Sequence, residues 1–180
     1  MHPLKIGWAV RAIIYKLTFG KIGNFTYVGK PCFIEGQRNI YIGNRVRIFP
    51  GIRMEAIGSG KIIIGDNVAI EQNVQINSMN SNLIIGDGVT IAGHVFITNE
   101  DHKYEDITKS VMEQGNIIAE TAIGDGCFIG YGTVILQGTI LGKHCVVGSN
   151  AVLKGVYSDY SVIVGVPGKI IKKINLKESV

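Results

Sequence analysis

The chain has 180 residues, enough for one domain with a substantial core, and 46% of them are hydrophobic. Glycine is frequent, with 24 residues, but the regular recurrence of apolar residues excludes both a collagen-like repeat and a disordered low-complexity chain. The formal net charge of +4 is mild, and the sequence contains neither an aromatic-interleaved basic stripe nor a zinc-binding spacing. We therefore expect no nucleic-acid binding.

The first expected element is a short amphipathic helix within residues 1–20. The apolar stretch 4–19 is interrupted by Lys5, Arg11 and Lys16, which makes it too short and too charged to span a bilayer, and no cleavage site of small residues follows it. Its periodicity is typical of a helix that packs against the rest of the domain. The residues available to pack are Trp8, Ile13, Ile14 and Leu17. The pattern also permits loose contact with a membrane surface.

From residue 21 onwards an aliphatic residue recurs at every sixth position. The clearest run is Ile123, Ile129, Ile135, Leu141, Val147 and Leu153. Glycine often follows the aliphatic residue, and a small or branched residue lies four positions after it. A helix with 3.6 residues per turn does not keep such a repeat on one face, and simple strand alternation does not require it.

Six residues suit a short strand followed by a corner, with three such units closing one triangular coil. The leading aliphatic residue of each strand then points inward, and successive coils stack about 4.8 Å apart. Glycine, asparagine and aspartate supply the unusual backbone angles of tight corners. The sequence Ile-Gly-Asp, which begins at Ile64, Ile85 and Ile123, is expected to form the same corner three times. We expect a mainly β fold, with one triangular parallel β-helix over residues 21–170.

One long interruption separates the repeats. Between Ile97 and Ile123 the sequence is polar and no six-residue repeat is kept. We therefore expect an extruded loop around residues 98–122, which projects from one corner of the prism. A loop of this length inside a compact domain is more often functional than accidental. It carries one histidine, His102, and it is where catalytic residues are expected.

The three cysteines do not make a disulfide framework, and a reduced, cytoplasmic protein is the simpler interpretation. Cys32, Cys127 and Cys145 each occupy the fifth place of a hexad, the small inward-facing one. Interior packing is therefore expected for them rather than catalysis. Cys127 and Cys145 lie one coil apart, where they could meet.

The end of the chain is basic and suggests a local anionic ligand. The lysines there are Lys169, Lys172, Lys173 and Lys177. We divide the chain into an N-terminal helical segment (1–20), the β-helix (21–170) and a basic C-terminal tail (171–180).

Three segments resemble the hexapeptide-repeat acyltransferases, and most of all the maltose, galactoside and exopolysaccharide O-acetyltransferases. They are residues 97–104, with His102 five places after an aliphatic residue, the long coil run 123–140, and the ending 160–172, where basic residues follow Gly-Val-Pro. The likeness covers nearly everything after about residue 22. It implies a left-handed β-helix that transfers an acetyl group from acetyl-CoA to a saccharide hydroxyl, without a metal. It also implies a homotrimer with its sites between subunits.

By this resemblance His102 is the general base, since a neutral imidazole accepts a proton readily at physiological pH. Exopolysaccharide-type relatives often carry a second histidine two places earlier, where this chain has Glu100. Glu100, Asp101 or Glu105 could orient the imidazole. Asn73 falls near the position of an active-site asparagine that would stabilise the oxyanion, although asparagine is also a common corner residue.

The resemblance also implies a groove for the pantetheine arm of CoA between two prisms. Backbone amides at coil corners would bind it near Gly130, Tyr131, Gly148 and Ser149. Basic residues near the CoA phosphates would be Lys154, Lys169 and Lys172. For these lysines, a solvated charged tail is the alternative.

Three other functions stay open. An N-acetyltransferase acting on an amino sugar, or an antibiotic acetyltransferase, would use the same donor. Carbonic anhydrases of the gamma type share the prism and bind metal through three histidines. This chain has His2, His94, His102 and His144, but not the close paired spacing of that family. A non-catalytic β-helix scaffold would give the extruded loop and the basic end no role.

Overall fold

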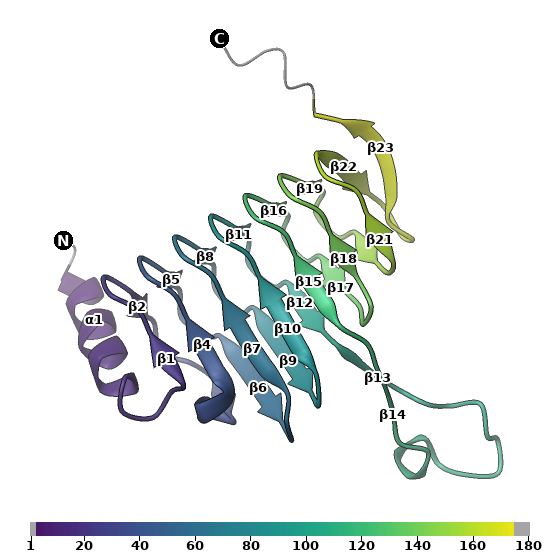
Figure 1. The fold of residues 1–180 in the computed structure, drawn as a ribbon, viewed down its shortest axis with the longest axis horizontal. Coiled ribbons are helices and arrows are strands. Elements are labelled where there is room, and N and C mark those ends of the chain that lie inside the picture. Colours follow the sequence, from purple (N-terminus) through teal and green to yellow (C-terminus); the bar gives the residue numbers. More distant parts are fainter. Residues whose placement is uncertain (1–2, 175–180) are drawn as a thin grey trace.

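The chain winds through three parallel sheets, and each coil adds one strand to each sheet. Our computed structural model describes residues 3–174, so that His2 and Lys177 lie outside the described residues. Figure 1 shows the coils stacked along one axis, with helix α1 (Pro3–Tyr15) at one end and strand β23 (Lys169–Lys173) at the other. The predicted left-handed parallel β-helix is confirmed.

The three sheets are named A, B and C in the order in which each coil passes through them. Sheet A consists of β1 (Lys21–Ile22), β4 (Ile40–Ile42), β7 (Lys61–Ile64), β10 (Asn82–Ile85), β15 (Thr121–Ile123), β18 (Ile140–Leu141) and β21 (Val156–Tyr157). Sheet B consists of β2 (Tyr27–Val28), β5 (Arg47–Ile48), β8 (Ala69–Ile70), β11 (Thr90–Ile91), β16 (Phe128–Ile129), β19 (Val146–Val147), β22 (Ser161–Val164) and β23. Sheet C consists of β3 (Phe33–Glu35), β6 (Arg53–Ile57), β9 (Gln75–Met79), β12 (Phe96–Thr98), β17 (Val134–Ile135) and β20 (Val152–Leu153). Two short 3-10 helices span Gln37–Asn39 and Val111–Glu113.

The aliphatic residue that leads each hexad lies in the core of the prism. In sheet B, for example, Ile91 pairs in register with Ile129, which pairs with Val147, and all three are fully buried. Burial of apolar surface at about 25 cal/mol per Å² makes these ladders the main source of stability. The six-residue repeat therefore describes the core correctly.

The edge between sheets A and B is closed by side chains of asparagine and aspartate. The Oδ1 atoms of Asn44, Asp66 and Asp87 accept hydrogen bonds of 2.9, 2.8 and 2.6 Å from backbone N–H groups one coil earlier. Hydrogen bonds from the backbone and side chain of Asn44 hold the pKa of the Asp66 carboxyl below its usual range. Asp66, Asp87 and Asp125 occupy equivalent corners, which confirms the prediction for the Ile-Gly-Asp segments.

Helix α1 packs on β1 and β2 through a different set of residues from the one expected. Trp8 contacts the rings of Tyr27 and Phe49, as predicted. Ile13, Ile14 and Leu17 are exposed instead of packed, because a helix presents only one face to the coil. The inner face is formed by Trp8, Ala12, Tyr15 and the following Phe19. No helix of the described residues is long and apolar enough to cross a membrane.

Two expected boundaries and one expected burial differ from the structure. The segment 98–122 is not wholly irregular, since β13 (Glu100–His102) pairs antiparallel with β14 (Asn116–Ile118). The expected basic tail begins inside a strand, because β23 folds back antiparallel on β22. Cys32 is exposed, since it lies in the first coil, where α1 covers mainly sheets A and B. Cys127 and Cys145 are buried as predicted, and the Cys145 N–H donates to the Cys127 Sγ at 3.4 Å.

Candidate active site

A β-hairpin leaves the edge between sheets C and A, as Figure 1 shows for β13 and β14. Buried polar residues anchor its base. The Asn99 Oδ1 atom accepts a hydrogen bond of 2.7 Å from the backbone of Met79, and the Asn99 Nδ2 donates to the Ser78 Oγ at 3.2 Å. The Thr121 hydroxyl donates to the carbonyl oxygen of Thr98 at 3.0 Å. Because buried polar groups that are fully paired adopt one geometry, the hairpin leaves the prism in a defined direction.

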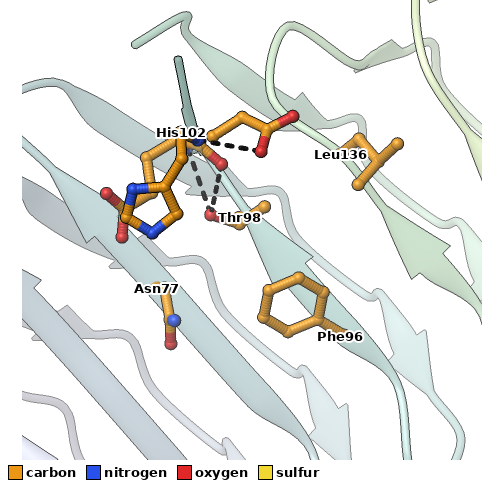
Figure 2. A pocket seen from close by; sticks show the side chains of 7 residues that line it. Asn77, Phe96, Thr98, His102 and Leu136 are labelled. Carbon is orange, nitrogen blue, oxygen red and sulfur yellow. Dashed lines mark hydrogen bonds between the residues drawn. The ribbon is translucent and has the colours of Figure 1, made fainter. Parts of the chain in front are cut away.

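A cavity of about 210 Å³ lies between the hairpin and the outer face of sheet C. Its lining residues are Asn77, Phe96, Thr98, Glu100, Asp101, His102 and Leu136. Figure 2 shows the imidazole of His102 on the same side of the cavity as Asn77, with Phe96 and Leu136 on the other side. The cavity combines a potential base, an amide and two apolar walls, which is a combination typical of small-molecule sites.

The acidic residues beside His102 contact groups other than its imidazole. The Asp101 Oδ1 accepts a hydrogen bond of 2.9 Å from the backbone N–H of His102, and the Asp101 Oδ2 accepts one of 3.3 Å from the Gln137 Nε2. The Glu100 Oε2 accepts a hydrogen bond of 2.6 Å from the Asn116 Nδ2. Glu105 accepts one from the backbone of Tyr104. Among residues 3–174, none of these carboxylates is hydrogen-bonded to the imidazole, and Asp101 instead fixes the backbone that carries it.

Asn77 also lines this cavity, although its sequence position did not single it out. It lies on β9, in register with Thr98 of β12, and this pairing places it beside the hairpin. Its Oδ1 lies 3.4 Å from the Gln75 Nε2, while its Nδ2 has no acceptor among the described residues and is free to donate into the cavity. The asparagine expected here, Asn73, occupies a corner with a positive φ of 58° and does not line the cavity. Asn73 and Asn77 lie four residues apart in the same coil. Asn77 lies within β9 and pairs with Thr98 beside the hairpin, whereas Asn73 lies at the corner before β9.

The edge between sheets B and C differs from the edge between sheets A and B in leaving backbone amides open. On the edge between sheets A and B, the backbone N–H groups of Asn24, Asn44 and Asp66 donate to an Asn or Asp side chain of the next coil. Within residues 3–174, the equivalent corner residues between sheets B and C have no such side chain in the next coil to accept their N–H groups. At this edge the N–H groups of Gln72, Gly93, Tyr131 and Ser149 have no acceptor among the described residues. This edge therefore presents a row of hydrogen-bond donors along the stack, suited to an extended ligand with carbonyl groups.

Four of the residues predicted to bind CoA, Gly130, Tyr131, Gly148 and Ser149, lie on this open edge. Tyr131 and Ser149 keep free N–H groups, but the N–H groups of Gly130 and Gly148 already donate to carbonyl oxygens of the next coil, at 2.9 and 2.8 Å. Asn73 also belongs to this edge, since its Nδ2 lies 3.2 Å from the Nε2 of His94. The structure thus groups Asn73 with the predicted cofactor residues and not with His102.

The predicted phosphate-binding lysines lie together at the end of the prism. The Tyr157 hydroxyl contacts the carbonyl oxygens of Lys154 and Gly168 at 3.5 and 3.2 Å, and Lys169 follows Gly168 at the start of β23. Lys172 lies on β23, opposite Val162, and all three lysines are exposed. In contrast, the Lys173 Nζ is held by Ser158, Ser161 and the carbonyl oxygen of Asp159.

Within the described residues, the buried cysteines and the other two histidines do not form a metal site. Burial raises the pKa of the Cys127 thiol to about 12, so this thiol stays protonated at neutral pH. His94 and His144 lie at corners on different edges of the prism, both with positive φ. In residues 3–174, no group of three or more His, Cys, Asp or Glu side chains is placed to hold a metal ion. The three-histidine arrangement of the carbonic anhydrases is therefore not formed by these residues.

Comparison with known proteins identifies the relatives of this fold and site. Residues 120–155 match the family model described as bacterial transferase hexapeptide (six repeats). The chain is 36% identical over 156 residues to WbbJ of Escherichia coli strain K12, which is described as an O-acetyl transferase of lipopolysaccharide biosynthesis. The aligned region covers 81% of this chain and 77% of WbbJ. It is 23% identical over 175 residues to the galactoside O-acetyltransferase of the same strain, and this alignment covers 97% of the present chain and 72% of that enzyme.

A solved structure supports the fold independently. AntD from Bacillus cereus, an N-acyltransferase in complex with dTDP and 3-hydroxybutyryl-CoA, superposes with a TM-score of 0.79 over 92% of this chain and 88% of AntD, at 20% identity. At that identity the likeness concerns the fold alone. The repeat, the prism and the similarity to WbbJ together show that this chain belongs to the hexapeptide-repeat acyltransferases.

Proposed function

We propose that this protein transfers an acetyl group from acetyl-CoA to a hydroxyl group of a saccharide, with His102 as the general base. The cavity that brings together the imidazole of His102 and the free Nδ2 of Asn77 is the observation that supports this proposal. Similarity to WbbJ, at 36% identity, supports a saccharide hydroxyl as the acceptor, and an amino sugar is the alternative acceptor that the experiment below tests. The three free cysteines fit a cytoplasmic reaction.

In the proposed reaction a ring nitrogen of His102 removes the proton of the acceptor hydroxyl while its oxygen attacks the thioester carbonyl. The Asn77 Nδ2 donates a hydrogen bond to the oxyanion of the tetrahedral intermediate. The carbon–sulfur bond then breaks, and the imidazolium returns its proton to the departing thiolate of CoA. Phe96 and Leu136 shield the reacting groups from water on the far side of the cavity.

The donor would lie along the open edge between sheets B and C. Its free N–H groups match the carbonyl oxygens of a pantetheine arm, and the exposed lysines at the end of the prism match the phosphates of CoA. In a single chain, this edge and the hairpin with His102 are at opposite sides of sheet C. Side-by-side packing of prisms in a homotrimer would bring the open edge of one chain to the cavity of the next, so we propose a trimer with its sites between subunits.

Donor binding and the chemistry of the product test this function separately. Titration calorimetry with acetyl-CoA is expected to show saturable binding near one molecule per chain. Radiolabelled acetyl-CoA is then incubated with a panel of neutral sugars and the matching amino sugars. Mild alkali releases an acetyl ester but leaves an acetyl amide intact, and we expect a label that alkali releases. An alkali-stable label would contradict the hydroxyl acceptor, and a folded protein that binds no acetyl-CoA would contradict acetyl transfer altogether.

Replacing Asn77 by alanine is expected to lower kcat by about two to three orders of magnitude, because one donor to the oxyanion is lost. The matched control is Asn73→Ala, which removes the same amide from the preceding corner of the same coil and is expected to leave kcat within about twofold of the parent value. Steady-state rates of CoA release measure both variants. A larger loss in Asn73→Ala than in Asn77→Ala would assign the oxyanion contact to the corner residue instead.

A further inference from the structure

Helix α1 has an apolar stripe on the face that does not touch the prism. Its inner face, with Trp8 and Ala12, covers the first coil. The stripe consists of residues between 50% and 77% exposed: Ile6, Val10, Ile13, Ile14 and Leu17. Their spacing of three and four residues puts them on one side, opposite the inner face. Helix α1 lies at the N-terminal end of the stack (Figure 1), and because its inner face covers the first coil, the stripe faces away from the coils.

An aromatic residue beside the helix extends this apolar surface. Phe25 is 89% exposed and has a positive φ of 57°, a conformation that bulky residues rarely adopt. With Ile13 and Lys16 it lines a groove of about 280 Å³ between α1 and the first coil. The equivalent corners at Arg45 and Asn67 also have a positive φ, so the fold requires this backbone angle but not an aromatic ring, and the exposed ring is available to a partner outside the prism.

The charge of the chain is concentrated at the same end. Residues 1–54 contain nine of the 18 basic residues and only one of the 14 acidic residues, Glu35. They carry a formal charge of +8, and residues 55–180 carry −4. In the first coil, Lys21 and Lys30 are exposed, and neither forms an ion pair within the described part of the chain. The excess of basic over acidic residues therefore lies in the N-terminal part of the chain, in addition to the cluster of lysines near the C-terminus.

We infer that the N-terminal end of the prism is a docking surface for an anionic lipid bilayer. The stripe and Phe25 would enter the interface, where apolar and aromatic side chains are favoured, and the surrounding lysines and arginines would contact the anionic headgroups. Because no acidic residue precedes Glu35, this end of the protein favours a negatively charged partner. Because the stripe is apolar, the partner also needs an apolar layer, and an anionic bilayer offers both. The axis of the prism then stands on the membrane, and the cavity with His102 lies several coils above it.

Co-sedimentation with vesicles tests this surface on the full chain without using the acetyl-transfer reaction. We expect binding to vesicles of phosphatidylglycerol and phosphatidylcholine in equal parts, and much weaker binding to phosphatidylcholine alone. Binding should fall when the salt is raised, since the Debye length drops from ~10 Å at 0.1 M to ~3 Å at 1 M. Ile13→Gln with Leu17→Gln is expected to lower the partition coefficient at least about tenfold, because glutamine tolerates the helix but not the apolar interface.

Two further variants keep the test sharp. Val156→Gln with Val166→Gln removes two similarly exposed aliphatic side chains at the opposite end of the prism and should leave vesicle binding unchanged. Phe25→Gly suits the positive φ, so it should preserve the fold while weakening binding. Equal losses in the Val156 and Ile13 double variants would overturn the proposal, as would a folded parent protein that does not bind anionic vesicles. A parent that ignores vesicles but loses self-association in the Ile13 variant would instead assign the stripe to contact between copies.

Discussion

Replacing His102 by alanine is expected to lower kcat by about two to four orders of magnitude, while the affinity for acetyl-CoA changes by less than about twofold. The reason is geometric. In the proposed trimer His102 meets only the thioester end of the donor, and the amides and lysines expected to hold its arm and phosphates lie elsewhere, so the substitution removes the proton acceptor and leaves those contacts in place. Steady-state release of CoA measures the first quantity, and titration calorimetry measures the second.

The matched control for His102 is a second exposed histidine. His144 stacks on Tyr160 at a corner between sheets A and B, with a positive φ of 52°. His144→Asn keeps a side chain that tolerates this backbone, and we expect unchanged turnover. Full activity in His102→Ala would remove the general-base assignment. A loss of acetyl-CoA binding equal to the loss of turnover would show instead that His102 contacts the donor.

Replacing Gly43 by alanine is expected to lower the free energy of unfolding by about 3 kcal/mol or more, the upper range for overpacking. Gly43 is buried at the edge between sheets A and B. A Cβ atom there would lie 2.5 Å from the carbonyl oxygen and 2.6 Å from the carbonyl carbon of Gly65 in the next coil. These are backbone atoms that move only if the coils separate, so we expect the midpoint of thermal unfolding to fall by about 6 °C or more.

Gly7→Ala serves as the opposite control. Gly7 lies within α1, and no atom lies within 4 Å of the position a Cβ atom would take. Alanine is the better helix former, so this variant should gain about 0.5–1 kcal/mol. Circular dichroism during denaturation compares both variants. A stable Gly43→Ala protein would mean that the coils are spaced more widely than the ladder of hydrogen bonds indicates.

The repeat made the core predictable because it imposes one local rule on every coil. An aliphatic residue at each sixth position has to point inward if the strands are short and the corners regular, and Ile91, Ile129 and Val147 do so. The corners could also be predicted, since the aspartate of the recurring Ile-Gly-Asp segment accepts a hydrogen bond from a backbone N–H group of the previous coil. His102 could be singled out because the repeat stops where the hairpin begins.

The repeat does not predict burial correctly at the end of the stack, where a coil has a neighbouring coil on one side only. Cys32 fits the inward position of its hexad but is exposed, because the coil it belongs to is the first one. Ile13, Ile14 and Leu17 have the period of a packed helix, and their period alone does not say which of two apolar faces meets the prism. The strand β23 also escaped prediction, since its pairing with β22 reverses the direction of the chain.

The β-helix, its corners, the position of the long interruption and the candidate base could all be read from the sequence. Which asparagine lies beside that candidate base depends on the folded structure. Asn73 and Asn77 are four residues apart, and the choice depends on the register of sheet C, which pairs Asn77 with Thr98 at the foot of the hairpin and leaves Asn73 at a corner with His94. The folded structure also decided which amides stay open, because a backbone donor is free only if no side chain of the next coil reaches it. Both depend on contacts between coils, which local sequence patterns do not encode.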